Sequence, residues 1–599
     1  MNMPDRVIRI GGASGFWGDS DQGPKQLVQR ARVDYLVFDY LAELTMSILA
    51  SARARSPELG YATDFVNSAM AAILRDVAEQ GVKVIANAGG LNPRACAAAL
   101  RALAEREGVS LRVAYVEGDD ILDRVPEFRA SDVKDMGSGR SLPDTLLSTN
   151  AYLGARPIAE ALALGAQVVI TGRCVDSALA LGALVHEFGW SFDDYDKMAT
   201  GSLVGHLLEC GAQATGGLHT DWRSVEDWEN IGYPIAECRG DGRLWITKPT
   251  GTGGLVNRAV ICEQMLYEIG DPGAYALPDV ICDFTGVEVE EVGPHRVEVR
   301  NAKGRPPSGF YKVSGTYPDG YRVTVQLVLI GIDAVAKAER TAHALLARVR
   351  ATLRERNLGD FTETLVEVVS GEAVYGPHSR ARGAREVQMR VSARHPEKQA
   401  LTVLAREVAQ AGTSWGPGTT GAGKRAEPSQ VVRLFSFLWP AADVQARVVL
   451  DGGSVDVAAP CGGDEAATPA PATSVASAPV GETVAVPLIR LAWARSGDKG
   501  DISNIGVIAR SPQALDVLRR ELTPERVKTY MAHLVEGEVR RFDLPGVGAF
   551  NFVLEKALGG GGMASLRIDP LGKGMGQILL DMPIQAPRAV VEALGGLVV

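Results

Sequence analysis

The sequence lacks a cysteine framework, a long apolar run and any surplus of basic residues. Its seven cysteines are scattered, odd in number and without a Cys-x-x-Cys pair, as is typical of free thiols in a reducing compartment. No apolar run reaches membrane-spanning length, and the first ten residues lead into a strand rather than a secretory segment. With a net charge of −10, the chain has no excess of basic residues that could neutralise phosphates, which argues against nucleic-acid binding. We therefore expect a soluble cytoplasmic protein with neither membrane nor nucleic-acid partners.

The first 190 residues alternate short apolar strands with helices. A chain of 599 residues is too long to fold around one hydrophobic core and should form two to four domains. Strands that alternate with helices of this length predict βαβ units, and hence a parallel, Rossmann-like α/β domain over residues 1–277. The predicted strands are Val7–Ile10, Tyr35–Phe38, Val82–Ala86, Leu111–Val116 and Gln167–Ile170.

Three further segments follow this domain. Alternating polar and apolar residues, for example in Arg296–Arg300, predict half-solvated antiparallel strands in an α+β subdomain over residues 278–457. Residues 458–483 are rich in Ala and Pro and cannot bury enough surface to offset ordering, so we expect a flexible linker. Residues 484–599 have the length and pattern of a small α/β sandwich.

Polar residues gather in the turns that follow the five predicted strands. In a parallel sheet these turns share the carboxyl edge, where ligands bind. The alternative is that Asp, Asn and Gly stand there as helix caps and turn formers. Taken together the turns favour a functional edge, with Asp39, Glu43, Asp176 and His206 as candidate acid–base catalysts. The candidate substrate-binding residues are Ser14, Asp19, Asn87, Asn92, Asp119 and Arg173 and, in a separate glycine-rich segment, Lys424.

The chemistry open to such an edge depends on its carboxylates. A carboxyl group with a raised pKa serves as the acid or base in hydration or enolisation beside a thioester carbonyl. Arg173 would then clamp a substrate carboxylate or phosphate. The same oxygens suit Mg²⁺, although their spacing matches no dedicated metal loop.

His206 and Glu209 stand three residues apart on a predicted helix and therefore share one face. A neutral histidine steered by a carboxylate is a workable acid–base pair. Leu207 and Leu208 lie between them, so a satisfied core histidine is the competing interpretation.

Two glycine-rich segments have part of the pattern of a nucleotide-binding loop. Gly416–Arg425 contains a GxxxxGK pattern, but Arg425 replaces the required Ser or Thr, which excludes a P-loop and leaves an anion-binding nest beside Lys424, for instance for CoA phosphates. Gly11–Gly15 is out of register with GxGxxG, which disfavours NAD. In the tail, Ser496–Asp501 predicts a polar loop that completes a neighbour's site or caps an edge.

Several composite motifs resemble those of the AtuA family of acyclic terpene utilisation proteins. They are Gly11–Asp19, Asp34–Glu43, Thr171–Ser177, Gly205–Cys210, Tyr267–Asp283 and, in the tail, Ala494–Asp501. The tail motif resembles the family's small C-terminal domain, and this implies a ferredoxin-type fold for residues 484–599. The resemblance also implies a role in the catabolism of citronellol- or geraniol-type compounds, or related branched acids, through CoA thioesters.

Two functions are consistent with these features. The first is a hydratase or lyase that acts on a branched acyl-CoA or carboxylic acid. The second is a non-catalytic scaffold that organises carboxylase and hydratase partners, which a flexible linker and a detachable tail would suit. In either case we expect a homo-oligomer in which tails pack across subunits.

Overall fold

The largest element of the fold is an eleven-stranded mixed sheet, seen in a computed structural model that describes residues 6–421, 423–462 and 482–595. Five neighbouring strands run parallel at its centre, in the order β1-β2-β3-β6-β4. They confirm the five predicted strands and the Rossmann-like class. Their bounds are β1 Val7–Ser14, β2 Tyr35–Phe38, β3 Lys83–Ala86, β4 Val113–Glu117 and β6 Val168–Ile170.

Helices cover both faces of this sheet, which explains why its central strands are continuous apolar runs. On one face α1, α3 and α4 pack with the strands into one core, and on the other α6, α7 and α8 pack into a second. Helix α7 is apolar on nearly every side because it lies between the sheet and α8. The bounds are α1 Gln22–Arg30, α3 Ala71–Gln80, α4 Pro93–Glu107, α6 Arg156–Ala163, α7 Ala178–Phe188 and α8 Tyr195–Leu208.

The sheet does not stop at the expected boundary between residues 277 and 278. Beyond β1 it continues through antiparallel β7, β8, β12 and β11, and beyond β4 through antiparallel β19 and β20. The alternating pattern correctly indicates antiparallel strands, but it does not specify which sheet they join. These strands are β7 Ile235–Arg239, β8 Leu244–Thr247, β11 Glu288–Gly293, β12 Arg296–Arg300, β19 Ala446–Leu450 and β20 Gly453–Val457.

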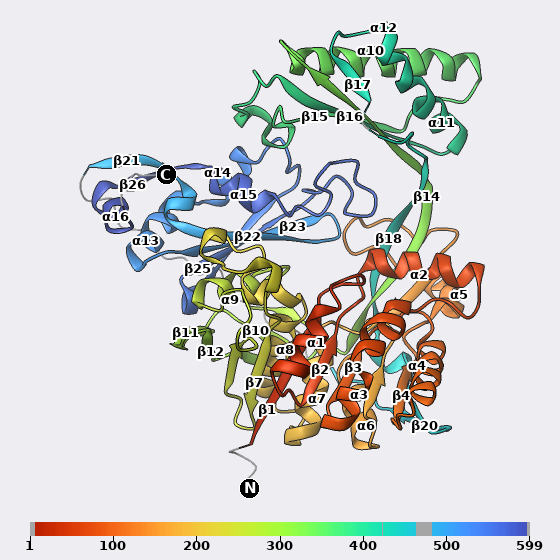
Figure 1. Cartoon of the computed structure of the whole chain (residues 1–599), viewed down its shortest axis with the longest axis vertical. Helices are drawn as coiled ribbons and strands as arrows, with labels where there is room; N and C mark the ends of the chain where they lie inside the picture. Colours follow the sequence, from red (N-terminus) through yellow and green to blue (C-terminus); the bar gives the residue numbers. More distant parts are fainter. Residues whose placement is uncertain (1–5, 422, 463–481, 596–599) are drawn as a thin grey trace.

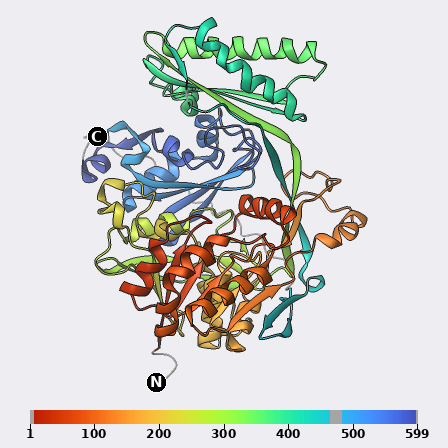
Figure 2. The same cartoon turned by 45° about the vertical axis from the view of Figure 1, so that its right-hand side comes forward.

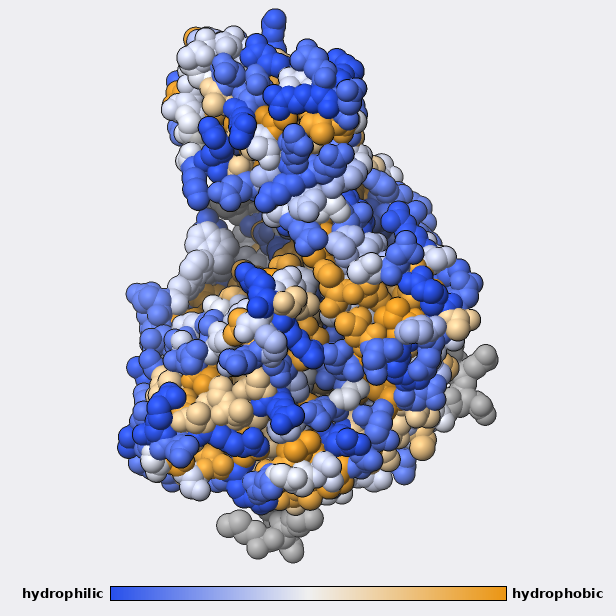
Figure 3. All heavy atoms as spheres, turned by 90° about the vertical axis from the view of Figure 1, so that its right-hand side faces the viewer, coloured by the Kyte–Doolittle hydropathy of each residue, from blue (hydrophilic) through white to orange (hydrophobic). Residues whose placement is uncertain are grey.

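One strand of 21 residues, β14 (Phe310–Ile330), links this body to an upper subdomain (Figures 1 and 2). Its first half pairs with β5 (Ser148–Ala151) and β18 (Ser429–Pro440), and its second half pairs with β16 (Glu386–His395). Helices α10 (Ala334–Glu355) and α11 (Lys398–Glu407) cover the far face of the upper sheet. Figure 3 shows the surface hollowed beneath this subdomain.

The tail is a separate antiparallel sheet of four strands, in the order β22-β23-β25-β24, backed by helices, as expected for a ferredoxin-like domain. Ser496–Lys499, predicted to be a loop, instead continues β22, because each of these residues pairs with β23 and only Gly500 and Asp501 turn the chain. Of the predicted linker, residues 463–481 lie outside the described residues. The tail elements are β22 Ala492–Lys499, β23 Ile502–Ala509, α13 Pro512–Glu521, α14 Pro524–Tyr530, β24 Val539–Leu544, β25 Ala549–Leu554 and α15 Met575–Leu580.

Within the described ranges, no helix combines the length and apolarity needed to cross a membrane.

Candidate functional site

The parallel strands end facing the tail domain, and polar side chains meet at this junction. In Figure 1 the strands rise from the N-terminal end of the chain toward the tail, which lies above them. The loop after α9 (Arg258–Met265) connects the two, since Asn504 of β23 donates to Leu266 O at 2.7 Å. The junction is therefore formed within one chain.

Asp39 follows β2 and is held by a neighbour that follows β3. Asn87 donates to Asp39 Oδ1 at 2.6 Å and accepts from Tyr40 N at 2.7 Å, so its amide fixes the carboxyl group. Asp39 is 7% exposed. Burial raises its pKa well above the ordinary value, and the carboxylates of Asp176 and Glu209 add to the shift. The surroundings of Asp39 thus favour its protonated form more than water would.

Arg173 lies at the turn after β6, against a carboxylate that supports the backbone. Asp119 accepts from Arg173 N at 2.8 Å and from Asn150 Nδ2 at 2.9 Å. Its oxygens lie so close to Gly172 that a Cβ there would stand 2.4 Å away. Asp119, predicted to bind substrate, is therefore placed beneath the turn, where it holds Arg173 in position.

The buried carboxyl group of Asp119 makes the stability of the protein depend on pH. Burial raises the pKa of Asp119 from an ordinary 3.8 to about 7, so between these values the folded protein holds a proton that the unfolded chain has lost. Stability should therefore fall as pH rises through this window. We expect Asp119→Asn to flatten that part of the profile in urea denaturation at several pH values. An equal slope in both proteins would contradict the assignment.

The guanidinium of Arg173 is engaged by neighbouring groups of the protein. It donates to Leu41 O at 2.9 Å and to Asp176 Oδ1 at 2.8 Å, and it lies 4.2 Å from the centre of the Tyr152 ring. Only 4% of its side chain is exposed. Arg173 therefore orients Asp176, which is 24% exposed, and has little surface left for clamping a substrate anion.

His206 and Glu209 stand together at the end of α8, as their spacing predicted. His206 Nδ1 lies 2.9 Å from Glu209 Oε1, and Nε2 lies 3.1 Å from Met265 O. Burial lowers the pKa of His206, but Glu209 more than offsets this and the net pKa is raised. Helix α8 can approach the backbone of Ser177 closely because residue 205 is a glycine, where a Cβ would stand only 2.4 Å from that backbone. The histidine is buried and also paired with a carboxylate at the site.

Glu43, the first residue of α2 (Glu43–Arg55), accepts from Tyr152 at 3.0 Å and from Lys312 of β14 at 3.4 Å. Burial acts to raise its pKa, but Lys312 and Arg173 lower it well below the ordinary value. Glu43 and Arg173 line one small cavity of about 10 Å³, the space of a single water. Glu43 is thus an ionised partner within the site.

The structure brings five of the predicted residues together: Asp39, Glu43, Asn87, Arg173 and Asp176, with His206 beside them. Ser14 lies next to them and donates to Asp39 O at 3.2 Å.

The other predicted residues have structural partners or lie elsewhere. Asp19 accepts from Gly15 N and Tyr233, and Asn92 caps α4 by accepting from Ala95 N. Lys424 is 90% exposed between β17 (Thr419–Gly421) and β18, in the upper subdomain, with Glu427 at 3.7 Å. Asp19 and Asn92 thus stabilise turns, and Lys424 lies in a different subdomain from the junction.

The tail supplies charged residues that the sequence interpretation did not place. Lys573 donates to Glu268 Oε1 at 2.9 Å and to Asp498 Oδ1 at 3.0 Å, and it also contacts the hydroxyl of Tyr267. Lys499 Nζ lies 3.6 Å from Glu268 Oε2. In the sequence, only the motif Ser496–Asp501 indicated that the tail contributes charged residues to a site. The motif does not show which part of the chain these residues contact.

The tail is fixed to the body by buried polar contacts. Arg495 donates to Glu263 Oε2 at 2.9 Å, with side chains 4% and 0% exposed, and Glu263 also accepts from Thr220 and contacts His219 Nδ1 at 2.9 Å. Asn551 donates to Ile269 O at 2.8 Å. The tail expected to be detachable is therefore docked on its own chain.

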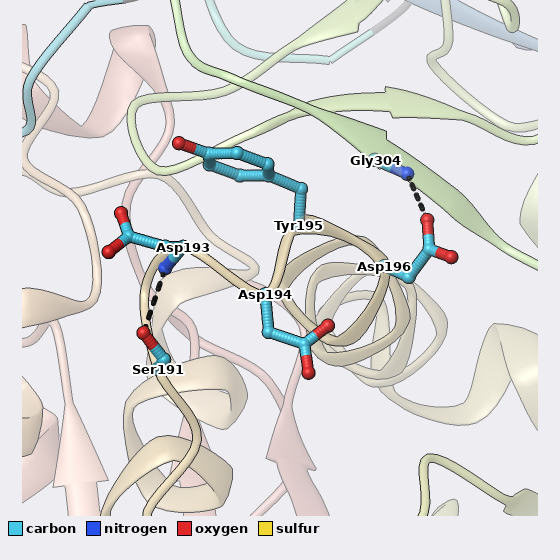
Figure 4. Close-up of a pocket in the computed structure, with 6 residues that line it drawn as sticks. All are labelled: Ser191, Asp193, Asp194, Tyr195, Asp196 and Gly304. Carbon is cyan, nitrogen blue, oxygen red and sulfur yellow. Dashed lines mark hydrogen bonds between the residues drawn. The ribbon is translucent and has the colours of Figure 1, made fainter.

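A second polar depression lies at the opposite end of α8 from His206 (Figure 4). Two of its three acids already have partners: Asp194 caps the helix by accepting from Lys197 N, and Asp196 accepts from Gly304 N and Lys303. It is shallow, and in the described parts of the chain no three His, Cys, Asp or Glu side chains are grouped to hold a metal ion. The junction remains the better candidate site.

Two family models match the chain. The model of the acyclic terpene utilisation family protein AtuA matches residues 8–450, and the model of the AtuA ferredoxin-like domain matches residues 486–585. No curated protein and no solved structure matches it.

Proposed function

Because the chain belongs to the acyclic terpene utilisation family AtuA, we propose that it is an enzyme of acyclic terpene breakdown that adds water to, or removes it from, a branched acyl thioester or acid. One observation carries the proposal. The carboxyl group of Asp39, whose pKa is raised by burial, lies within electrostatic reach of two further carboxylates, Asp176 and Glu209, at the carboxyl edge of a parallel sheet. A buried carboxyl group whose pKa is raised by its surroundings and by a specific charged neighbour marks a candidate proton-transfer site.

Hydration needs one group that gives a proton and one that takes a proton. In our proposal the oxygen of water bonds to the β-carbon of an α,β-unsaturated acyl group while Asp176 takes a proton from that water. The electron pair of the double bond moves toward the carbonyl, and Asp39 delivers its proton to the α-carbon. Dehydration is the reverse of this step.

His206 and Glu209 fit as the pair that restores the starting protonation. Glu209 contacts His206 at 2.9 Å and interacts electrostatically with both Asp176 and Asp39, so in our proposal the proton that Asp176 took from water passes through this pair back to Asp39. Arg173 keeps Asp176 in place through their 2.8 Å contact. A homo-oligomer remains part of the proposal, although tails that dock in cis give it no special role at this site.

The test is to incubate the purified protein with geranoyl-CoA and related branched thioesters and follow their masses. We expect a reversible gain of one water, and we expect His206→Gln to lower kcat about 10²-fold while changing KM little. His186→Gln, on α7 and partly buried away from the junction, is the control. Unchanged thioesters, together with co-purification of another pathway enzyme, would favour the scaffold instead.

A further inference from the structure

Lys499 stands at the tip of a rigid hairpin. It is the last residue of β22 and pairs with Ile502 across the turn Gly500–Asp501. Asp501 Oδ1 accepts from Leu558 N at 3.1 Å and from Gly560 N at 2.8 Å, which fixes the turn from the other side. The position of the lysine is therefore set by the tail sheet.

The tail sheet is itself held against the site. Asn504, which faces Gly497 across the hairpin, binds Leu266 O and accepts from Glu268 N at 2.9 Å. Within the tail, Ser496 donates to Gly572 O at 2.6 Å and accepts from Gly576 N at 2.9 Å, which fixes the end of β22 in its own domain. The Asn504 contacts hold this part of the tail against the loop that follows α9 in the body.

The two tail lysines differ in how fully they are paired. Lys573 has two carboxylates within 3.0 Å, whereas the nearest carboxylate to Lys499 is Glu268, at 3.6 Å. In the described parts of the chain no hydrogen bond joins the Lys499 ammonium to another residue, and 47% of its side chain is exposed. Lys499 thus has room for a ligand oxygen.

The surroundings of Lys499 come from the body. Partial loss of contact with water opposes the charge of this half-exposed lysine, but Glu268, Tyr275, Asp176 and Glu43 raise the pKa of Lys499 well above its ordinary value. The ammonium therefore stays charged while it faces the same Asp176 that receives the proton of water in the proposed reaction.

We propose that the Lys499 ammonium binds the carbonyl or carboxylate oxygen of the substrate's acyl group, so that the C-terminal domain forms part of the substrate site. This inference rests on the proposed function. Negative charge gathers on that oxygen as the β-carbon is attacked, and a cation already in place stabilises it. The ligand class is a branched α,β-unsaturated acyl group, as a free acid or as a thioester.

The experiment compares Lys499→Met, Lys499→Arg and the exposed control Lys556→Met in the full chain. Binding of geranate and of geranoyl-CoA is measured by calorimetry, and folding by thermal melting. We expect Lys499→Met to melt like the wild type but to bind the better probe at least about tenfold more weakly. Its kcat should fall about 10²–10³-fold, with partial rescue by arginine.

The outcomes separate this inference from the proposed function. Wild-type affinity in a folded Lys499→Met protein overturns the role of Lys499, as does a wild-type protein that binds neither probe. Binding that depends on Lys499 without any change in thioester mass supports the subsite and contradicts the hydration chemistry. Preference for geranate or for geranoyl-CoA decides between the free acid and the thioester.

Discussion

Asp39→Asn should reduce turnover of a branched thioester by about 10²–10⁴-fold while leaving the protein folded. Asparagine matches the shape of the neutral carboxylic acid and can still accept the 2.6 Å hydrogen bond from Asn87. Because burial raises the pKa of Asp39 and disfavours its charged form, a neutral asparagine suits the same place in the folded core. Turnover is measured by mass, and stability by urea denaturation.

A matched substitution controls for the loss of an acidic side chain. Asp193→Asn changes an acid in the shallow depression at the far end of α8, and it should leave both turnover and stability unchanged (Figure 4). Residual activity near that of the wild type in Asp39→Asn would remove Asp39 from the mechanism. A loss of stability would show instead that the carboxyl group is structural.

Arg495→Met should have the largest effect on stability. It leaves Glu263 charged and fully buried with its principal partner gone, a change that typically costs about 3–5 kcal/mol of unfolding free energy. The His219 and Thr220 contacts remain but supply no permanent positive charge to replace the guanidinium. Urea denaturation measures the loss.

Hydrogen exchange locates the effect of this substitution. Backbone amides of residues 266–270, which contact the tail through Asn504 and Asn551, should exchange faster in Arg495→Met. Arg588→Met, which breaks an exposed pair with Glu482, should change neither measurement. Unchanged stability in Arg495→Met would mean that the tail is held by its other contacts alone.

The parallel core and much of the site could be predicted from the sequence because both depend on local order. Asp39, Asn87 and Arg173 follow adjacent strands, and parallel strands end at one edge, so their meeting follows from the strand pattern. His206 and Glu209 were paired by helical spacing alone.

The other part of the site depends on contacts between residues far apart in the chain. Glu43 meets Lys312, which lies 269 residues away on β14, and Lys499 comes from a separate sheet. The periodicity of hydrophobic residues along the chain does not predict a contact between residues so far apart in sequence. For the same reason the glycine-rich run near Lys424 indicated an anion site without revealing that it belongs to the upper subdomain.

The sequence did not indicate which sheet strands β12 and β19 join, for a related reason. Strands β12 and β19 have the alternation of antiparallel strands, but hydrogen bonding to β8 and β4 places them in the first sheet. Hydrophobic periodicity indicates which face of a strand is buried, but it does not indicate which other strand lies beside it.

The central claim is that a proton passes between Asp39 and the substrate's α-carbon at the junction of body and tail. The most direct test incubates the wild type and Asp39→Asn with geranoyl-CoA in deuterated water and follows carbon-bound deuterium by mass spectrometry. We predict that deuterium enters the acyl chain with the wild type and not with Asp39→Asn. No incorporation with either protein, or equal incorporation with both, would contradict the account.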